Sequence, residues 1–291
     1  MHPVLIEIGP ISIRFYGLMY VIAILLALFM LRGEIRRKQL PLTEDRLADF
    51  LLFVVLGGIV GARIYYVVFN WDYYGANPLQ IPAIWRGGLA IHGGLIGGFL
   101  AGFWFCRHYQ IPLWRMADTV APNIILGQTL GRFGNFMNGD AHGLPLDSPQ
   151  LPWIVRAYWP KWLGVVFPPG SIAGDQFPGQ LTHPAMLYEL VLDGLAFAFL
   201  WKIRTRPAKD GFLFGLYLIL YSIIRFFVSF FRADSLMLGS LRAAQVVSVL
   251  LVLIVGAIMF HKRLWVADTS PPASQPVTAK QTRKRRKRSR R

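Results

Sequence analysis

Residues 211–231, GFLFGLYLILYSIIRFFVSFF, form a long apolar run that contains a single charged side chain, Arg225. A helix needs about 20 predominantly apolar residues to cross a hydrocarbon core about 30 Å thick. Runs of this kind recur along the 291-residue chain, which is 54% hydrophobic and 16% charged, a composition that excludes an ordinary soluble domain. We therefore expect an all-α integral membrane protein with seven transmembrane helices, at residues 15–31, 48–69, 89–106, 116–133, 184–201, 211–231 and 242–260.

The distribution of basic residues predicts an orientation. The loops after the first, third, fifth and seventh expected spans hold Arg32, Arg36, Arg37, Lys38, Arg46, Arg107, Arg115, Lys202, Arg204, Arg206, Lys209, Lys262 and Arg263. An excess of Lys and Arg marks cytoplasmic loops. The N-terminus is then outside and the C-terminus cytoplasmic, and the long segment 134–183 forms a small periplasmic head.

The C-terminal segment explains much of the formal net charge of +16. Nine of the 31 Lys and Arg residues lie in the last twelve positions, KQTRKRRKRSRR, after a Pro- and Ser-rich stretch. We expect a polytopic membrane domain over residues 1–265, followed by a disordered basic cytoplasmic tail over 266–291. Such a tail favours contact with anionic membrane lipids. Nucleic-acid binding is the alternative, and we expect no nucleic-acid partner.

Cysteine, metal and targeting signals are sparse. The single cysteine, Cys106, excludes a disulfide within the chain and is expected to be a small buried residue rather than a nucleophile. The amino-terminal region lacks the features of a cleaved signal peptide. No cluster of residues resembles a metal site, and we predict no cofactor.

Several ionisable residues interrupt the apolar runs, where they are costly and by default mark a site. They are Arg63, His92, Asp118, Arg132, Glu189, Asp193 and Arg225. The segment around His92 also has small residues at four-residue spacings, which allow close helix approach, namely Gly93, Gly97, Ala101 and Gly94, Gly98, Gly102. His92 is therefore either a general base in an accessible setting or a hydrogen-bond partner across a helix interface.

The expected sixth span carries a polar stripe. Its members, spaced at i, i+4, i+8 and i+11 on one helix face, are Tyr221, Arg225, Ser229 and Arg232. Two arginines on such a stripe favour a phosphate ligand, because guanidinium binds phosphate oxygens bidentately. The alternative is that Glu189 or Asp118 neutralises them. Glu189 and Asp193 are four residues apart, so both lie on one helix face, within reach of an arginine on a neighbouring helix.

Five motifs in this order resemble the bacterial prolipoprotein diacylglyceryl transferases. They are FYGLMY (15–20), GGLAIHGGLIGG (87–98), GRFGNFMNGDAHG (131–143), THPAMLYE (182–189) and RFFVSFFRAD (225–234). The resemblance extends to about residue 260. It implies an inner-membrane enzyme that moves the diacylglyceryl group of phosphatidylglycerol to the lipobox cysteine of prolipoprotein signal peptides, forming a thioether and releasing glycerol 1-phosphate, the first step of lipoprotein maturation.

The resemblance also implies roles for individual residues. The expected catalytic residues are His92, Arg132 and Arg225, with the two arginines as a phosphate clamp and His92 as the leading candidate base. Arginine-assisted or water-mediated deprotonation of the thiol is the alternative. The residues expected to bind substrate are Tyr16, Arg132, Asn135, Asn138, Asp140, Gly143, Glu189 and Arg232.

Two positions depart from the family pattern, which carries glutamate where this chain has Asp140 and Ser229. The shorter Asp140 side chain must shift its contact, and without a carboxylate at position 229 Arg225 needs a counter-ion from elsewhere, such as Glu189.

Two other classes of protein share the chemistry of outward-facing arginines. One is a transporter or flippase for an anionic solute, and the other is a lipid-headgroup transferase that uses phosphoryl chemistry. The lack of a visible internal repeat and of a carboxylate-rich metal motif counts against them.

Overall fold

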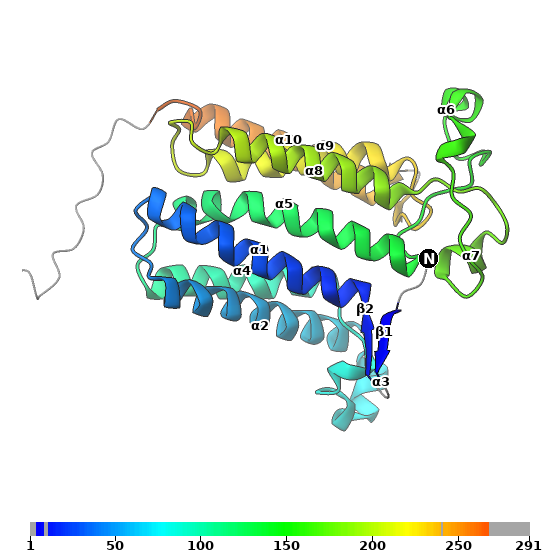
Figure 1. Ribbon diagram of the computed structural model, residues 1–291, viewed down its shortest axis with the longest axis horizontal. Helices are drawn as coiled ribbons and strands as arrows, with labels where there is room; N and C mark the ends of the chain where they lie inside the picture. The colour runs from blue at the N-terminus through cyan, green and yellow to red at the C-terminus, as the bar shows by residue number, and fades with distance from the viewer. Residues whose placement is uncertain (1–3, 9–10, 240, 268–291) are drawn as a thin grey trace, which may run out of the picture.

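The computed structural model describes residues 4–8, 11–239 and 241–267. Its long helices run side by side in one bundle (Figure 1). They are α1 (Phe15–Arg37), α2 (Glu44–Phe69), α4 (Ile91–His108), α5 (Leu113–Asn138), α8 (Ala185–Ile203), α9 (Phe212–Ser229) and α10 (Ala243–Lys262). Each overlaps one of the predicted spans. Four of them, α1, α2, α9 and α10, are long and apolar enough to cross a membrane.

Short elements connect the long helices. They are the strands β1 (Val4–Ile8), β2 (Ile11–Arg14), β3 (Met237–Leu238) and β4 (Leu241–Arg242), and the short helices α3 (Trp71–Ala76), η1 (Pro78–Gln80), η2 (Ile84–Arg86), α6 (Trp153–Tyr158), η3 (Lys161–Leu163) and α7 (Ile172–Gln176). The strands form two antiparallel hairpins, β1–β2 and β3–β4. The chain is mostly helical, as expected, and the two short hairpins are additions that the sequence did not predict.

Several helices end elsewhere than the apolar runs do. Helix α1 continues to Arg37 and α5 continues to Asn138, past the expected ends at 31 and 133. Basic side chains in the last turn of α1 suit the negative end of the helix dipole. Helix α9 ends at Ser229, so Arg232 lies outside the helix that was expected to carry it.

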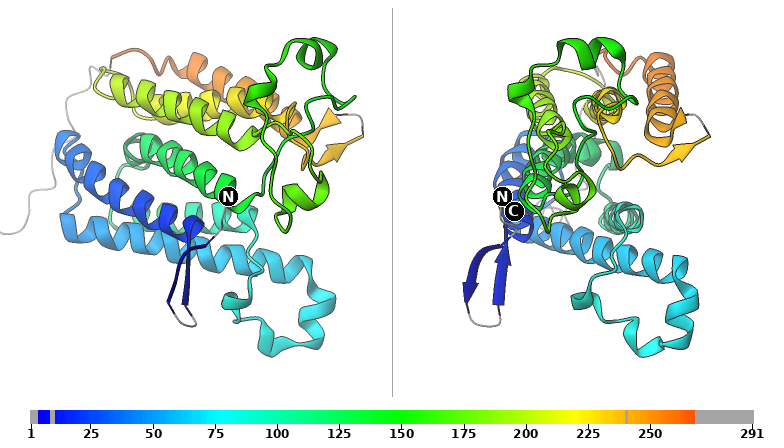
Figure 2. Two further views of the ribbon diagram at one scale, coloured as in Figure 1. Left: turned by 45° about the vertical axis from the view of Figure 1, so that its right-hand side comes forward. Right: turned by 90° about the vertical axis from the view of Figure 1, so that its right-hand side faces the viewer.

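Helix α5 lies at the centre of the bundle. Helix α1 packs along one side of it and α8 and α9 pack along the other, while α2 pairs with α4 and α10 pairs with α9. The segment with α6 and α7 projects beyond one end of α5, and the β1–β2 hairpin and α3 lie at the same end of the bundle (Figures 1 and 2). The predicted head therefore begins at Gly139, which ends α5 in a left-handed conformation, rather than at residue 134.

The contact between α2 and α4 depends on glycines, as the small-residue spacing predicted. A Cβ atom on Gly97 would collide with the Gly57 carbonyl oxygen and lie 2.9 Å from the Gly61 Cα atom. A Cβ atom on Gly98 would lie at 3.5 Å from the nearest atom, the Val54 carbonyl oxygen, which is ordinary contact. Only one of the two glycine rows on α4 therefore sets the distance between the helices.

We expect Gly97→Ala to lower the free energy of unfolding by about 1–3 kcal/mol, because the added methyl group must push two backbones apart. Gly98→Ala changes the same helix by the same group at a position with room, so it is the matched control and should be close to wild type. Unfolding in detergent micelles, followed by circular dichroism, compares the two. Equal stability of both variants would contradict this account of the interface.

Two charged residues inside the helices have structural partners. Arg63 donates hydrogen bonds to four backbone carbonyl oxygens in the loop that carries η1 and η2, at 2.7–2.9 Å. Asp118 accepts hydrogen bonds from the backbone N–H groups of Gly211 and Phe214, both at 2.8 Å, and so caps the first turn of α9. Asp118 is therefore not the counter-ion of Arg225, and of the two carboxylates expected to neutralise the arginines only Glu189 contacts them.

Candidate anion-binding site around Glu189

Glu189 is fully buried on α8 and forms ion pairs with three arginines. Its Oε1 atom lies 2.8 Å from Arg132 Nη2, and its Oε2 atom lies 3.3 Å from Arg225 Nη1 and 3.4 Å from Arg232 Nη1. These arginines come from α5, from α9 and from the segment after α9. One carboxylate thus gathers charges from three separate parts of the chain, and it supplies the counter-ion that Arg225 lacks at Ser229.

Arg232 has a second carboxylate partner. Its Nε and Nη2 atoms donate to the two oxygens of Asp234 at 2.9 and 2.5 Å, a bidentate pair. Burial alone would raise the pKa of Asp234, but the hydrogen bonds and charge of Arg232 hold that pKa below its usual range. Asp234 therefore stays ionised at neutral pH. With two carboxylates and only 6% of its side chain exposed, Arg232 is fixed as part of the scaffold.

Arg132 and Arg225 remain more accessible than Arg232. The exposed fractions of their side chains are 20% and 25%, and Glu189 is the carboxylate that each contacts. Among the groups in direct contact, three guanidinium cations face two carboxylate anions, Glu189 and Asp234. These five groups together carry a net charge of +1. A partly buried positive charge of this kind attracts an anion, and guanidinium suits a phosphate group.

A chain of hydrogen bonds continues from Arg132 along α5. Arg132 Nη1 donates to Asn135 Oδ1 at 3.2 Å, and the amide group of Asn135 donates to Asp140 Oδ1 at 2.6 Å. Asn138 donates to the other oxygen of Asp140 at 2.7 Å. Asp140 therefore holds both asparagine amides, although its side chain is shorter than the glutamate of the family pattern. Both asparagines lie within α5, beyond residue 133, where the expected span ended.

Gly143 lies where three backbone segments meet. It forms an isolated antiparallel bridge with Arg232, and the neighbouring Leu144 donates its N–H to the Phe231 carbonyl at 2.7 Å. A Cβ atom at position 143 would collide with the carbonyl oxygen of His183 and lie 2.8 Å from that of Phe231. The absence of a side chain at Gly143 thus positions the segment that carries Arg232.

Tyr16 lies in the first turn of α1 and packs against α5. A Cβ atom on Gly134 would lie 2.8 Å from the Tyr16 ring, so this glycine lets the tyrosine approach α5 two residues beyond Arg132. The Tyr16 hydroxyl group accepts a hydrogen bond from Tyr20 at 3.2 Å. Tyr16 is thus placed at the edge of the cluster, and Gly134, where the head was expected to begin, lies within α5.

His92 lies apart from the arginine cluster. It is exposed near the start of α4, and its ring centroid is 5.9 Å from that of Tyr65 on α2. No hydrogen bond or ion pair joins His92 to Arg132, Arg225 or Arg232 within the part of the chain that the structure describes. The ring is accessible, as one of the two predictions for His92 required. The other prediction, a hydrogen bond from His92 across a helix interface, is not among the contacts of the described residues.

Other buried polar groups adjoin the cluster. Asp193 lies one turn after Glu189 on the same buried face of α8, and neither of its oxygens has a hydrogen-bond partner among residues 4–8, 11–239 and 241–267. His183, just before α8, has its Nδ1 atom 3.1 Å from the Tyr188 hydroxyl, and burial lowers its pKa to about 4. His183 is therefore neutral at pH 7 and is enclosed by protein.

Sequence reasoning missed two residues of the site. Asp234 neutralises Arg232, and Arg242 donates to the carbonyl oxygens of Ser229 and Arg232, the latter at 2.8 Å. Arg242 thus holds the chain where it leaves α9. The Arg-Ala-Asp spacing of residues 232–234 was a possible signal for Asp234, whereas nothing local marks Arg242. In the described residues, no group of three or more His, Cys, Asp or Glu side chains is placed to hold a metal ion.

Comparison with known proteins gives one consistent family. The profile described as prolipoprotein diacylglyceryl transferase matches residues 3–261. A Staphylococcus haemolyticus protein named phosphatidylglycerol–prolipoprotein diacylglyceryl transferase is 40% identical over 279 residues, which cover 96% of this chain and 94% of the relative. Relatives of the same name from Staphylococcus xylosus and Staphylococcus aureus are each 41% identical, covering 91% and 96% of this chain and 90% and 94% of their own lengths.

The match covers nearly every part of the site described above. It includes α5, α8 and α9, which carry Arg132, Glu189 and Arg225, and it continues almost to the end of α10. Identity of this level over most of both chains does not arise from shared apolar composition alone. The chain belongs to the prolipoprotein diacylglyceryl transferase family.

Proposed function

We propose that this protein transfers the diacylglyceryl group of phosphatidylglycerol to the lipobox cysteine of prolipoprotein signal peptides. The single observation that carries the proposal is the set of three arginines on one buried carboxylate, since a phosphate group must be held and its negative charge stabilised. The names of the relatives identify the same two substrates for those proteins. The product of the reaction is a thioether-linked lipid, and glycerol 1-phosphate is released.

In this reaction the cysteine sulfur attacks the glycerol carbon that bears the phosphate. A carbon–sulfur bond forms, the carbon–oxygen bond breaks, and its electron pair leaves on the phosphate oxygen. The thiol proton must first be removed, because a thiol with a pKa near 8.5 is mostly protonated at pH 7. The phosphate of the leaving group gains negative charge as the bond breaks, so cations at that oxygen lower the barrier.

The accessible arginines take the role of a phosphate clamp. Arg132 and Arg225 retain exposed surface, whereas Arg232 and Glu189 are buried and position the other two. Asn135, held by Asp140, orients Arg132 and is proposed to contact the headgroup beside it. Asn138 supports this arrangement through its side-chain hydrogen bond to Asp140, Gly143 supports it through close backbone packing, and Tyr16 borders it on α1.

The proposal includes a location and an orientation. All seven long helices cross the bacterial inner membrane, with the head and the Glu189 cluster on the periplasmic side and the C-terminus in the cytoplasm. Support comes from the basic residues that follow α1, α4, α8 and α10, because Lys and Arg accumulate in cytoplasmic loops. The predicted basic tail lies largely outside the described residues.

Mass spectrometry tests the proposed reaction. The purified protein is incubated with phosphatidylglycerol and a peptide that carries a lipobox cysteine, and a peptide with serine at that position is the control. We expect the diacylglyceryl adduct on the cysteine peptide alone, together with released glycerol phosphate. Movement of phosphatidylglycerol between leaflets without an adduct would support a flippase instead, and a phosphorylated peptide would support phosphoryl chemistry.

The role of His92 as general base has its own test. His92→Gln keeps a hydrogen-bonding side chain but cannot take up the proton, so we expect turnover to fall by about 100-fold or more at neutral pH. The loss should shrink as the pH approaches that of free thiol ionisation, because the thiolate then forms without a base. Turnover is measured between pH 6 and 9. A variant that keeps most of its rate at every pH would show that another group removes the proton.

A further inference from the structure

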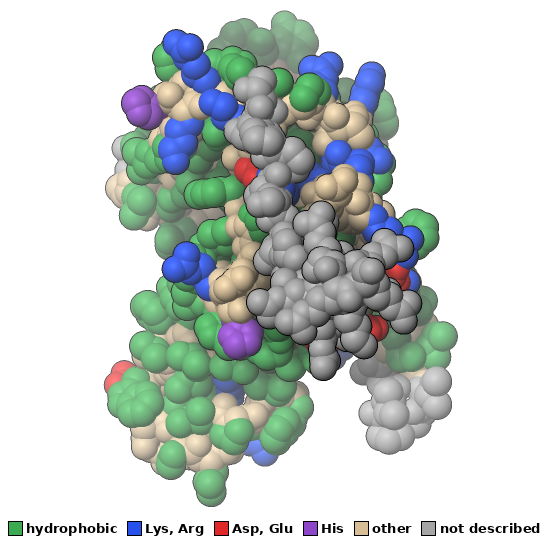
Figure 3. All heavy atoms as spheres, turned by 90° about the vertical axis from the view of Figure 1, so that its left-hand side faces the viewer, with side chains coloured by type: hydrophobic (Ala, Val, Ile, Leu, Met, Phe, Trp, Pro, Cys, Tyr) green, Lys and Arg blue, Asp and Glu red, His purple; other side chains and the backbone are tan. Residues whose placement is uncertain are grey.

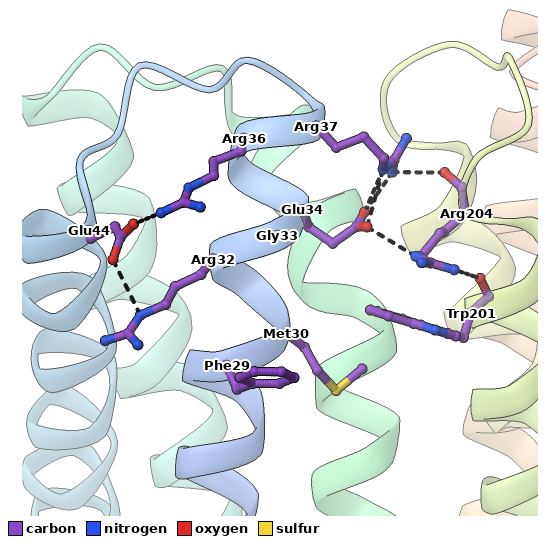
Figure 4. Close-up of a pocket in the computed structure, with 10 residues that line it drawn as sticks. All are labelled: Phe29, Met30, Arg32, Gly33, Glu34, Arg36, Arg37, Glu44, Trp201 and Arg204. Carbon is purple, nitrogen blue, oxygen red and sulfur yellow. Dashed lines mark hydrogen bonds and ion pairs between the residues drawn. The ribbon is translucent and has the colours of Figure 1, made fainter.

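A second basic cluster lies at the opposite end of the bundle from Glu189. It lines a pocket of about 590 Å³ between the end of α1, the start of α2 and the end of α8. Its lining includes four arginines, two glutamates and three large apolar side chains, namely Arg32, Arg36, Arg37, Arg204, Glu34, Glu44, Phe29, Met30 and Trp201 (Figure 4). Other Lys and Arg side chains surround this end of the bundle (Figure 3).

The two glutamates serve different arginines. Glu34 is buried, and it accepts hydrogen bonds from Arg37 at 2.5 Å and from Arg204 at 3.0 Å. Arg37 also donates to the carbonyl oxygen of Arg204, and the Arg204 guanidinium lies 3.6 Å from the centre of the Trp201 ring. This inner half of the pocket is therefore a fixed arrangement in which both arginines contact one buried carboxylate.

The outer half of the pocket is less completely paired. Arg36 forms an ion pair with Glu44, and Arg32 Nε lies 3.7 Å from the same carboxylate, beyond the usual hydrogen-bond length. The exposed fractions of these three side chains are 47% for Arg32, 74% for Arg36 and 48% for Glu44. Two arginines thus share one exposed carboxylate, so most of their N–H donors face solvent.

The apolar side of the pocket continues along the outer face of α1. Phe29 is 75% exposed, and Leu25, one turn nearer the middle of the helix, is also exposed. In a membrane these side chains face lipid tails, so the arginines above them lie at the level of the headgroups. A ligand that spans both parts needs a negative headgroup and a hydrocarbon chain. A free anion would use the arginines but not the apolar surface.

We propose that this pocket binds an anionic phospholipid that is not the substrate of the enzyme. The phosphate displaces Glu44 from Arg32 and Arg36, and an acyl chain lies along Phe29 and Leu25. Basic pockets at helix ends on the cytoplasmic side suit such headgroups, and guanidinium matches the phosphate oxygens. The site is separate from the Glu189 cluster, because Arg204, at the end of α8, follows Glu189 by fifteen positions, which at 1.5 Å per residue place them about 22 Å apart.

The test compares lipid binding by matched variants. The full-length protein is reconstituted in phosphatidylcholine nanodiscs with phosphatidic acid as the probe, and bound lipid is counted by native mass spectrometry. We expect Arg32→Gln with Arg36→Gln to bind phosphatidic acid at least about ten-fold more weakly at one site, because two charge-assisted contacts are lost. Arg107→Gln removes an exposed arginine at the same end of the bundle, outside the pocket, and should bind as wild type does. Equal binding by the double variant and Arg107→Gln overturns the proposal.

A second variant is expected to strengthen lipid binding, so an unfolded protein could not give the expected result. Glu44→Gln removes the carboxylate that competes for Arg32 and Arg36, so phosphatidic acid should bind several-fold more tightly. Unchanged or weaker binding overturns the proposal. Inorganic phosphate at the same concentration should not displace the lipid; if it does, the pocket is a site for free anions. Transfer from phosphatidylglycerol by the double variant should stay within two-fold of wild type, which separates this site from the one around Glu189.

Discussion

Arg225→Ala should lower kcat/KM for transfer from phosphatidylglycerol by about 10²–10³-fold, the usual effect of removing one group that stabilises a developing negative charge. Arg225 is accessible and forms its ion pair with Glu189 at 3.3 Å. In the free enzyme its charge is only partly compensated, so it is ready to contact a phosphate. Arg225→Lys keeps the charge but loses the planar pair of donors, and its activity should be intermediate.

The matched control is Arg156→Ala, which removes an exposed arginine from α6 in the head, outside the Glu189 cluster. It should retain wild-type turnover. Both variants are assayed with a cysteine peptide while the lipid concentration is varied, so that kcat and KM are obtained separately. Near-normal turnover in Arg225→Ala, with an intact fold by thermal unfolding, would remove Arg225 from the phosphate clamp.

Glu189→Gln should cause the largest loss of stability. The carboxylate is fully buried and contacts three arginines, and removing one partner of a buried ion pair costs about 3–5 kcal/mol because the remaining charge is left uncompensated. Glutamine has almost the same size, so the effect measures charge and not volume. Unfolding in detergent micelles reports the free energy, and turnover should also fall because Arg132 and Arg225 lose the group that aligns them.

Asp193→Asn provides the control one turn along α8. Asp193 is equally buried, but its oxygens have no hydrogen-bond partner among the described residues, so neutralising it removes no ion pair. We expect Asp193→Asn to be as stable as wild type or more stable, because an unpaired buried carboxylate is itself costly. If Glu189→Gln and Asp193→Asn unfold at the same denaturant concentration, the three-arginine network does not stabilise the protein.

The positions of the long helices were largely predictable, because an apolar run of about 20 residues has few structures other than a helix available to it in a membrane. Their ends were not predictable to the same degree. The last turns of α1 and α5 carry Arg37 and Asn138. Polar residues occur both in the last turn of a helix and in the loop after it, so they do not mark where the helix ends. The hairpins were missed, since pairing between strands of two to five residues depends on what surrounds them.

The sequence identified several residues of the site by their type, but it did not identify which residues contact one another. A charged residue in an apolar run signals a special environment, and Arg132, Glu189 and Arg225 were found in that way. The same signal also marked Arg63 and Asp118, whose partners are backbone groups far along the chain. Spacing on a helix cannot reveal such partners, because they lie on other elements. It also placed Arg232 on a helix that ends three residues earlier.

The three arginines around Glu189 have an implication for how the chain is made. Helix α5, with Arg132, leaves the ribosome before α8 does, so its arginine reaches the membrane while its carboxylate partner is still unsynthesised. Arg132 lies six residues before the end of α5, so an unpaired arginine there costs less to insert than the roughly 2.5–3.5 kcal/mol of one at the middle of a span. Helix α5 also lies outside the four helices whose composition suffices for a span. In the proposed seven-span topology, Arg132 therefore gains its carboxylate partner only after α8 has been made, and we expect α5 to insert less stably in a chain truncated before α8.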